Sequence, residues 1–218
     1  MGHPKGSSCD LAEPAKATQA ALAKQTSTHV TLTAHSGTTG ATEKIIADVG
    51  STSGTEDISE GSAGVTITVT PSFAYVSGNK SGLTKLFGLS ASQAAKVGRK
   101  WVSWTAGTGQ YRTFIRTSPC HGSPRCCPRP KGQLRRRRRL GAEERTYVLK
   151  CKAEATTSMP PLSNTMAISS SEPILPLADT ATASGGTKIT TVLSKWGEEV
   201  VVPTSRANST ISSTKLGS

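Results

Sequence analysis

Aromatic side chains are scarce in this chain, whose 218 residues include only three Trp, three Tyr and three Phe. Hydrophobic residues make up 34% of the sequence, which is little for a tightly packed globule. The core must therefore be built from Val, Ile, Leu and Ala, or be partly open. No run of 18 apolar residues occurs, so no segment is predicted to span a membrane. The length predicts one domain.

Catalytic signatures are also missing. The four histidines, His3, His29, His35 and His121, are scattered, and no nucleophile and base stand in a recognisable arrangement. No glycine-rich loop follows a predicted strand and opens a helix, so nucleotide binding is unsupported. The acidic residues of the first third are predicted to be solvated: Glu43, Asp48, Glu56, Asp57 and Glu60. We expect a protein that is not an enzyme and holds no cofactor.

The five cysteines do not form a zinc-binding pattern. Cys9 lies near the N-terminus, Cys151 lies in a predicted strand, and the other three lie between residues 116 and 145. The strongest metal candidate is the set Cys120, His121, Cys126 and Cys127. Adjacent ligands in a proline-rich segment close a tetrahedron poorly, so we predict no metal site.

Positive charge is concentrated in residues 116–145, which hold ten Lys or Arg against two Glu, whereas the whole chain carries a net charge of +12. The run Arg135–Arg139 could neutralise nucleic-acid phosphates. Aromatic residues do not interleave with these arginines, and no recognition module is visible. Nucleic-acid binding through this run is therefore a less favoured alternative.

The same segment differs from its Thr- and Val-rich surroundings in a way that a shifted reading frame would explain. Read one base out of frame, codons for Arg125 to Pro128 give apolar residues like those on either side. We hypothesise a single-base error near Arg116 that is corrected before Tyr147, and we expect residues 117–145 to be disordered or poorly packed. Resequencing the gene tests this, and an unbroken frame across the arginine run would refute it.

The remaining sequence alternates between strand and helix patterns. Residues 10–25 predict a helix, and Ser90 with Gln93 predicts a capping box that opens a second helix to about Lys100. Residues 81–88 predict a short helix that ends at a glycine. Alternation of apolar and polar residues predicts strands at 29–34, 44–49, 65–70, 73–76, 101–104, 147–152, 166–169, 174–178, 188–193 and 199–202.

This order predicts an α+β fold with one curved antiparallel sheet and helices on one side. Residues 179–186 are expected to be a hairpin loop. The predicted domain spans residues 10–203, preceded by a disordered segment at 1–9 and followed by a flexible tail at 204–218.

Several segments together resemble a known family. They are HVTLTA at 29–34, VTITVT at 65–70, FAYVSGN at 73–79, GLTKLFGLSASQAAKVGRKWV at 82–102 and LSKWGEEVVV at 193–202. This set resembles actinobacterial cell-envelope lipoproteins of the LppX/LprG type, which have a LolA-like fold. The resemblance covers residues 10–115 and 146–203.

The resemblance implies a half-barrel of antiparallel strands, with helices packed across its concave face and an apolar cavity that holds lipid acyl chains. The residues expected to line that cavity are Val30, Leu32, Val65, Ile67, Val69, Leu83, Leu86, Phe87, Val97 and Ile189. It also implies a monomer on the outer face of the plasma membrane, anchored through a lipidated Cys9. The family's export signal is absent from the sequence as written.

One alternative stays open at this point. An envelope surface protein that carries no ligand and acts through protein contacts would show the same sequence features.

Overall fold

The computed structural model describes residues 12–112, 134–137, 146–153, 162–183, 185–202 and 209–217. The described residues form a 12-stranded sheet in the order β12-β6-β5-β4-β3-β2-β1-β11-β10-β9-β8-β7. The strands are β1 (Ser27–His35), β2 (Thr42–Gly50), β3 (Gly54–Glu60), β4 (Ala63–Val69), β5 (Phe73–Gly78), β6 (Trp101–Thr105), β7 (Leu134–Arg137), β8 (Thr146–Ala153), β9 (Leu162–Ser169), β10 (Pro176–Ala183), β11 (Lys188–Ser194) and β12 (Thr210–Ser212).

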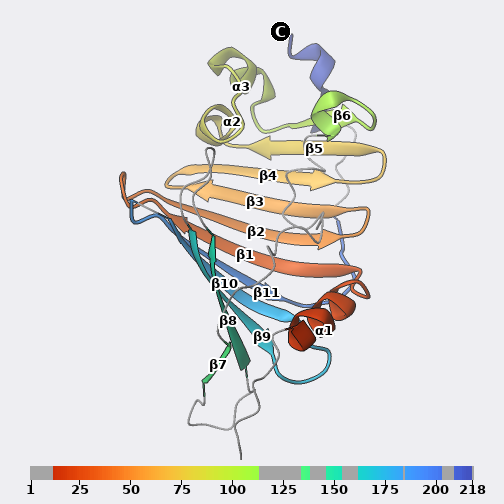
Figure 1. Cartoon of the computed structure of the whole chain (residues 1–218). Helices are drawn as coiled ribbons and strands as arrows, with labels where there is room; N and C mark the ends of the chain where they lie inside the picture. Colours follow the sequence, from red (N-terminus) through yellow and green to blue (C-terminus); the bar gives the residue numbers. More distant parts are fainter. Residues whose placement is uncertain are drawn as a thin grey trace, which may run out of the picture.

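The sheet is open and curved. Every neighbouring pair is antiparallel except β12 and β6, which run parallel, and β12 and β7 are the two edges. The strand direction turns progressively from β5 at one end to β8 at the other (Figure 1). This turning follows from the right-handed twist of each strand, accumulated over many neighbours. The predicted fold class, a curved antiparallel sheet with helices in an α+β fold, is confirmed.

Strands β1 to β6 pair with one another in chain order. The C-terminal half of the chain then adds β11 beside β1, in the middle of the sheet. The first five strands form a meander, as their alternating sequences predict. Strand β11 pairs with β1, with Leu32 opposite Thr191, so residues about 160 positions apart become neighbours. The centre of the sheet therefore depends on pairing between the two halves of the chain.

Two short helices lie together at the β4–β6 end of the sheet. Helix α2 (Lys80–Lys85) begins at Asn79, whose side chain accepts a hydrogen bond from the Gly82 amide at 2.7 Å. Helix α3 (Ala91–Val97) begins with the predicted capping box, in which Ser90 and Gln93 bond each other's backbone amides. Figure 1 shows both helices at the end of the sheet away from α1 (Ala12–Leu22). The predicted helices in all three regions are confirmed.

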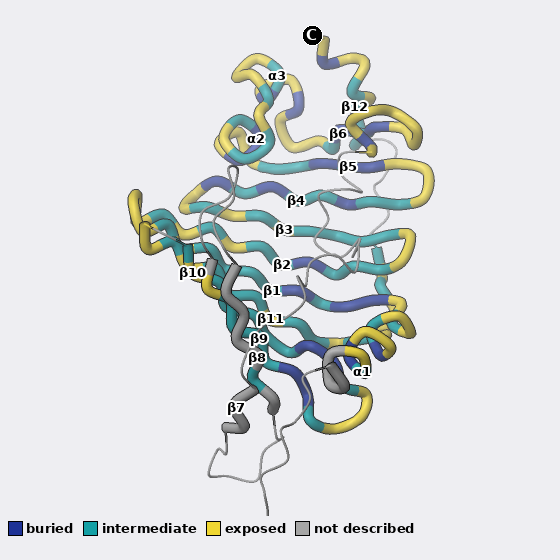
Figure 2. The backbone as a smooth tube through the Cα atoms, viewed as in Figure 1, coloured by how far each residue is buried: buried dark blue, intermediate teal, exposed yellow. Residues whose placement is uncertain are grey.

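The principal core lies under α2 and α3. Its buried residues are Val65, Val76, Leu83, Ala94, Val97, Val102, Trp104 and Leu216. Figure 2 shows buried backbone positions along β1, β4 and β5, with exposed positions at the turns between strands.

Two predicted boundaries in the C-terminal half are wrong. Residues 179–183 belong to strand β10 and are not part of a loop, which shortens the hairpin to the turn around Gly185 and Gly186. Residues 199–202 form no strand, and the Val201 side chain is 77% exposed. The two residues before this segment are bound to β1: the Ser27 carbonyl accepts a hydrogen bond from the Gly197 amide at 3.0 Å, and the Ser27 hydroxyl donates to the Glu198 carbonyl.

The sequence pattern predicts neither strand β3 nor the ordered structure of the C-terminal residues. Strand β3 carries three acidic residues in seven, which disfavours a strand, but β2 and β4 pair with it on both sides. Residues 209–217 were predicted to be loose, yet they form β12 and a 3-10 turn, η3 (Ser213–Lys215), that brings Leu216 into the core. Apolar Ile211 and Leu216 anchor this Ser- and Thr-rich segment.

Disorder was predicted for residues 117–145. Of these, residues 134–137 form strand β7 against β8, and the others lie outside the described residues.

Candidate functional site

The cross-strand registers gather apolar side chains on one face of the sheet. Directly opposed residues of an antiparallel pair point to the same side. Ile189 lies opposite Ala34, Leu32 opposite Ile45, Ile45 opposite Ile58, Ile58 opposite Val65, and Ile67 opposite Val76. We call this side the inner face. All six predicted cavity residues that lie on strands share it: Val30, Leu32, Val65, Ile67, Val69 and Ile189.

The opposite side, the outer face, carries mainly Thr, Ser and charged residues. Thr66 donates a hydrogen bond to the Asp57 carboxylate at 2.6 Å, and His29 contacts Asp48 at 2.7 Å. Since side chains alternate along a strand, the two faces take alternate residues of the same sequences. The sheet is therefore amphipathic, with its apolar side turned toward α2 and α3.

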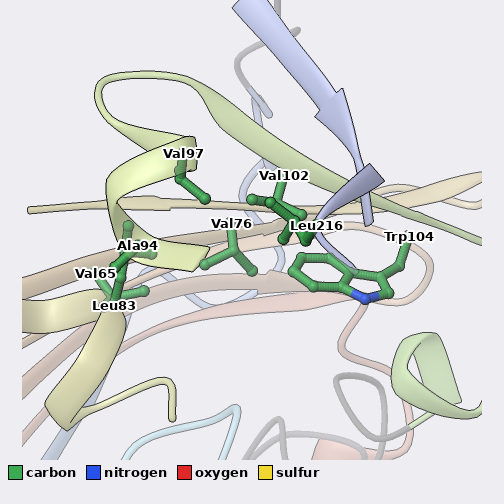
Figure 3. Packing of buried hydrophobic residues seen from close by; sticks show 8 residues of the cluster. All are labelled: Val65, Val76, Leu83, Ala94, Val97, Val102, Trp104 and Leu216. Atoms are coloured by element: carbon green, nitrogen blue, oxygen red, sulfur yellow. The ribbon is translucent and has the colours of Figure 1, made fainter. Parts of the chain in front are cut away.

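Protein side chains fill the helix-covered end of the inner face. Val65, Leu83 and Val97 are at most 3% exposed and belong to one cluster. Figure 3 shows Leu83, Ala94 and Val97 from the helices directed toward Val76 and Val102 of the sheet. Leu86 and Phe87 also pack on this cluster, and the Phe87 ring centroid lies 5.5 Å from that of Trp104.

The middle of the inner face is different. Leu32, Ile45, Ile58, Val69 and Ile189 are half-buried, and Val30 is fully buried. Within the described part of the chain, the core cluster includes no residue of β1, β2, β3 or β11. The ten predicted lining residues thus fall into two groups, one that packs against α2 and α3 and one on the central strands. Their role as a lining stays a prediction.

A carboxylate, Glu56, stands among the apolar residues of the central strands. It lies opposite Ala47 on one side and Ile67 on the other. Burial raises the pKa of Glu56 above its usual value, and the nearby Glu43 carboxylate raises it further. The expectation that Glu56 is solvated is therefore wrong, because the alternation of β3 turns it to the inner face.

A second polar pair occupies the inner face of β9 and β10. Asp179 lies opposite Met166 and Thr191. Burial raises the pKa of Asp179, while hydrogen bonds from the Asn164 side chain and the Thr180 backbone act in the opposite direction. Among the described residues, one buried side-chain oxygen of Asn164 and one of Asp179 have no hydrogen-bond partner. The sequence pattern does not reveal this pair, since it predicts a hairpin loop for residues 179–186.

Neutralising Glu56 is expected to stabilise the protein at neutral pH. A raised pKa means that the folded state binds the proton of Glu56 more tightly than the unfolded state does. The ionised carboxylate therefore destabilises the fold at pH values above its pKa in the folded state. This destabilisation disappears at pH values below its pKa in the unfolded state. A Glu56→Gln variant should melt roughly 2 °C higher than the parent at pH 7, a small shift because solvent still screens part of the group. The gain should vanish at about pH 4. Thermal melts at both pH values measure this.

Asp57→Asn is the matched control, because Asp57 is the next residue, lies exposed on the outer face and accepts the Thr66 hydrogen bond. It should give no gain at either pH. A lower melting temperature for Glu56→Gln at pH 7 would contradict the burial argument.

The candidate metal ligands and part of the arginine run lie outside the described residues. Within the described residues, no group of three or more His, Cys, Asp or Glu side chains gathers, and no helix is long and apolar enough to cross a membrane. Cys9, Cys120, His121, Cys126 and Cys127 lie outside the described residues. Of the arginine run, Arg135 to Arg137 form part of β7, and Arg138 and Arg139 lie outside the described residues.

Comparison with known proteins rests on structure alone, because no family model and no curated protein matches the sequence. LprF from Mycobacterium bovis superposes with a TM-score of 0.52 at 13% identity, covering 88% of this chain and 95% of LprF. The chain has the LprF fold. The lipoprotein LppX from Mycobacterium tuberculosis aligns with a TM-score of 0.49 at 14% identity, covering 88% of this chain and 97% of LppX. The LprF-like fold agrees with the family that the sequence segments resemble. At 13% identity, the likeness to LprF is one of fold alone.

Proposed function

We propose that this protein is a non-enzymatic lipoprotein of the cell envelope that binds lipid acyl chains on its inner face. The observation that carries the proposal is the half-buried apolar surface of the central strands, formed by Leu32, Ile45, Ile58, Val69 and Ile189. This surface lies beside the filled core and outside it. The LprF-like fold of the chain supports the same function.

The chemistry of this surface suits an acyl chain. Each methylene group removed from water contributes about 0.8 kcal/mol, so a chain of many methylenes can bind tightly without any hydrogen bond. The apolar side chains of the central strands make no directional contacts that would fix one chain length. Binding is therefore expected to be strong and broad in selectivity. The packed residues Val65, Leu83 and Val97 would close one end of the binding surface.

A matched pair of variants on one strand tests this function. Ile189 lies on the inner face of β11 and Val192 on its outer face, where it is 46% exposed. Ile189→Gln should weaken the binding of a fluorescent fatty acid such as cis-parinaric acid by roughly tenfold, since a buried amide without a partner costs about 1–3 kcal/mol. Val192→Gln should bind like the parent. Fluorescence titration gives both dissociation constants.

Native mass spectrometry of the parent, purified from an actinobacterial host, should show a co-purified acyl lipid. Equal affinities for the two variants would contradict binding on the inner face. If the parent neither carries lipid nor binds the fatty acid, the alternative gains support, namely an envelope surface protein that acts through protein contacts.

We also propose that Cys9 is the lipid-modified residue. Helix α1 begins at Ala12, so an anchor at Cys9 would place the folded domain directly beside the membrane. The same mass measurement, on protein expressed behind a lipoprotein export signal, should show a diacylglycerol adduct on Cys9. An unmodified Cys9 in membrane fractions would refute the anchor and leave the acyl-chain proposal to the binding experiment.

A further inference from the structure

Charge is segregated between the two ends of the meander. Residues 61–112 and 209–217 contain seven Lys or Arg and no Asp or Glu, whereas residues 27–60 contain five acidic residues and one Lys. The two basic stretches form a single unit, because they share the core under α2 and α3. We call this unit the basic end. Its seven cations are Lys80, Lys85, Lys96, Arg99, Lys100, Arg112 and Lys215, all exposed.

Contacts between α3 and the C-terminal segment bring part of this charge together. The Gln93 side chain donates to the Gly217 carbonyl at 2.8 Å, and Lys96 donates to the Leu216 carbonyl at 3.4 Å. Arg99 and Lys100 follow directly after α3, in the turn that leads into β6. Figure 1 shows α3, β6 and the C-terminus at the same end of the sheet.

Most of these cations have no carboxylate partner among the residues that the structure describes. Among the described residues, Lys85 is the one member of the seven that pairs with a carboxylate, that of Glu60 at 2.8 Å. Like charges held close together repel each other and raise the positive potential of the surface. The fold keeps these cations at one end of the sheet and places acidic residues on β2 and β3. The basic end is therefore complementary to an extended anionic partner.

Aromatic side chains lie at the same end of the sheet, on the outer face, opposite the face that α2 and α3 cover. Phe73 is 37% exposed, and its ring centroid lies 5.7 Å from that of Tyr75. Trp101 follows Lys100 and shares the outer face with Tyr75, because Tyr75 lies opposite Ser103, two residues further along β6. Three of the nine aromatic residues of an aromatic-poor chain thus lie on the outer face of β5 and β6. Such rings, apolar with a polar edge in Tyr and Trp, are enriched at membrane–water interfaces.

We propose that the basic end is a docking surface for anionic phospholipid membranes. The cations would lie among the phospholipid headgroups, and Phe73 and its neighbours would enter the interfacial region. The acidic strands β2 and β3 would be repelled, which fixes the orientation of the sheet against the membrane. The docking does not require a ligand on the inner face, so it stands apart from the acyl-chain proposal.

Vesicle co-sedimentation tests the docking with two matched triple variants of the full chain. The first variant, Lys96→Gln, Arg99→Gln and Lys100→Gln, removes three charges from the basic end. The second, Lys44→Gln, Lys188→Gln and Lys195→Gln, removes three exposed charges elsewhere. Both keep the arginine run at 135–139, so its contribution is common to the two.

Vesicles that contain phosphatidylglycerol and phosphatidylcholine should bind the parent, and pure phosphatidylcholine vesicles should not. The first variant should bind the anionic vesicles about a hundredfold more weakly, since each cation near such a surface contributes about fivefold. The second should stay within severalfold of the parent. Binding should weaken as salt is added. Thermal melts of both variants establish that they are folded.

A third variant, Phe73→Ser, separates a membrane from other polyanions. It should weaken binding to vesicles and leave binding to heparin or DNA unchanged. Equal vesicle binding by the two triple variants would overturn the proposal. It would also be overturned if Phe73→Ser had no effect on vesicles while heparin competed fully, because the surface would then bind polyanions in general.

Discussion

A Gly82→Ala variant is expected to lose about 3 kcal/mol of folding free energy, the upper part of the range for overpacked sites. The direction is opposite to the usual one, since alanine in a helix is ordinarily about 1 kcal/mol better than glycine. The reason is a close approach between helix and sheet. A Cβ atom at Gly82 would lie 2.1 Å from the Gly64 carbonyl oxygen and 2.5 Å from its carbon, both in the backbone of β4.

The clash at Gly82 cannot be relieved locally. The Gly64 carbonyl already accepts the Asn79 amide at 3.1 Å, and the Asn79 side chain caps the helix through the Gly82 amide at 2.7 Å. Helix α2 must therefore lift from β4, which separates Leu83 from Val65 and opens the core. Urea denaturation measures the loss. Ser81→Ala, an exposed neighbour in the same helix, should change stability by less than about 0.5 kcal/mol. A Gly82→Ala variant as stable as the parent would contradict this packing.

The elements that the sequence predicted well are those specified by their own residues. The alternation of three β-branched apolar residues with two threonines defines β4, and the pair Ser90 and Gln93 defines the start of α3. In both cases the signal is confined to a few neighbouring residues. Such signals are independent of how the rest of the chain folds.

The elements that were missed or misplaced depend on distant partners. Strand β3 is rich in acidic residues and is a strand because β2 and β4 flank it. The second half of β10, from Asp179 to Ala183, has a weak apolar pattern, yet β9 and β11 pair with it on both sides. Residues 199–202 have the better strand sequence and no partner strand. Pairing thus outweighed intrinsic propensity in each case.

The candidate site shows the same division. Alternation placed Val30, Leu32 and Ile189 on one face, and the registers agree. The same alternation could have revealed Glu56, which stands two residues before Ile58 on β3 and so shares its face. No local sequence pattern indicates that the inner face has a filled end and a half-buried centre. This division arises because α2 and α3 pack on one end of the sheet through tertiary contacts.

Leu216→Ala is expected to destabilise the fold by about 3 kcal/mol, within the range for truncating a buried leucine. Leu216 is 5% exposed and contacts the core cluster with Val102 and Trp104 (Figure 3). Strand β12 holds it there, since Ile211 pairs with Val102 in the parallel register with β6. The composition of residues 204–218 alone predicts a loose tail, and in a loose tail the same substitution would change nothing.

The measurement for Leu216 is chemical denaturation of the variant beside Thr214→Ala, an exposed substitution in the same turn that should cost less than about 0.5 kcal/mol. Hydrogen exchange adds a local test, because the amides of β12 should be protected in the parent and exchange faster in Leu216→Ala. The carbonyl oxygens of Leu216 and Gly217 accept hydrogen bonds from the side chains of Lys96 and Gln93, respectively. Loss of the Leu216 side chain should therefore also loosen α3. Equal stability of the two variants would mean that the C-terminal segment is not part of the core.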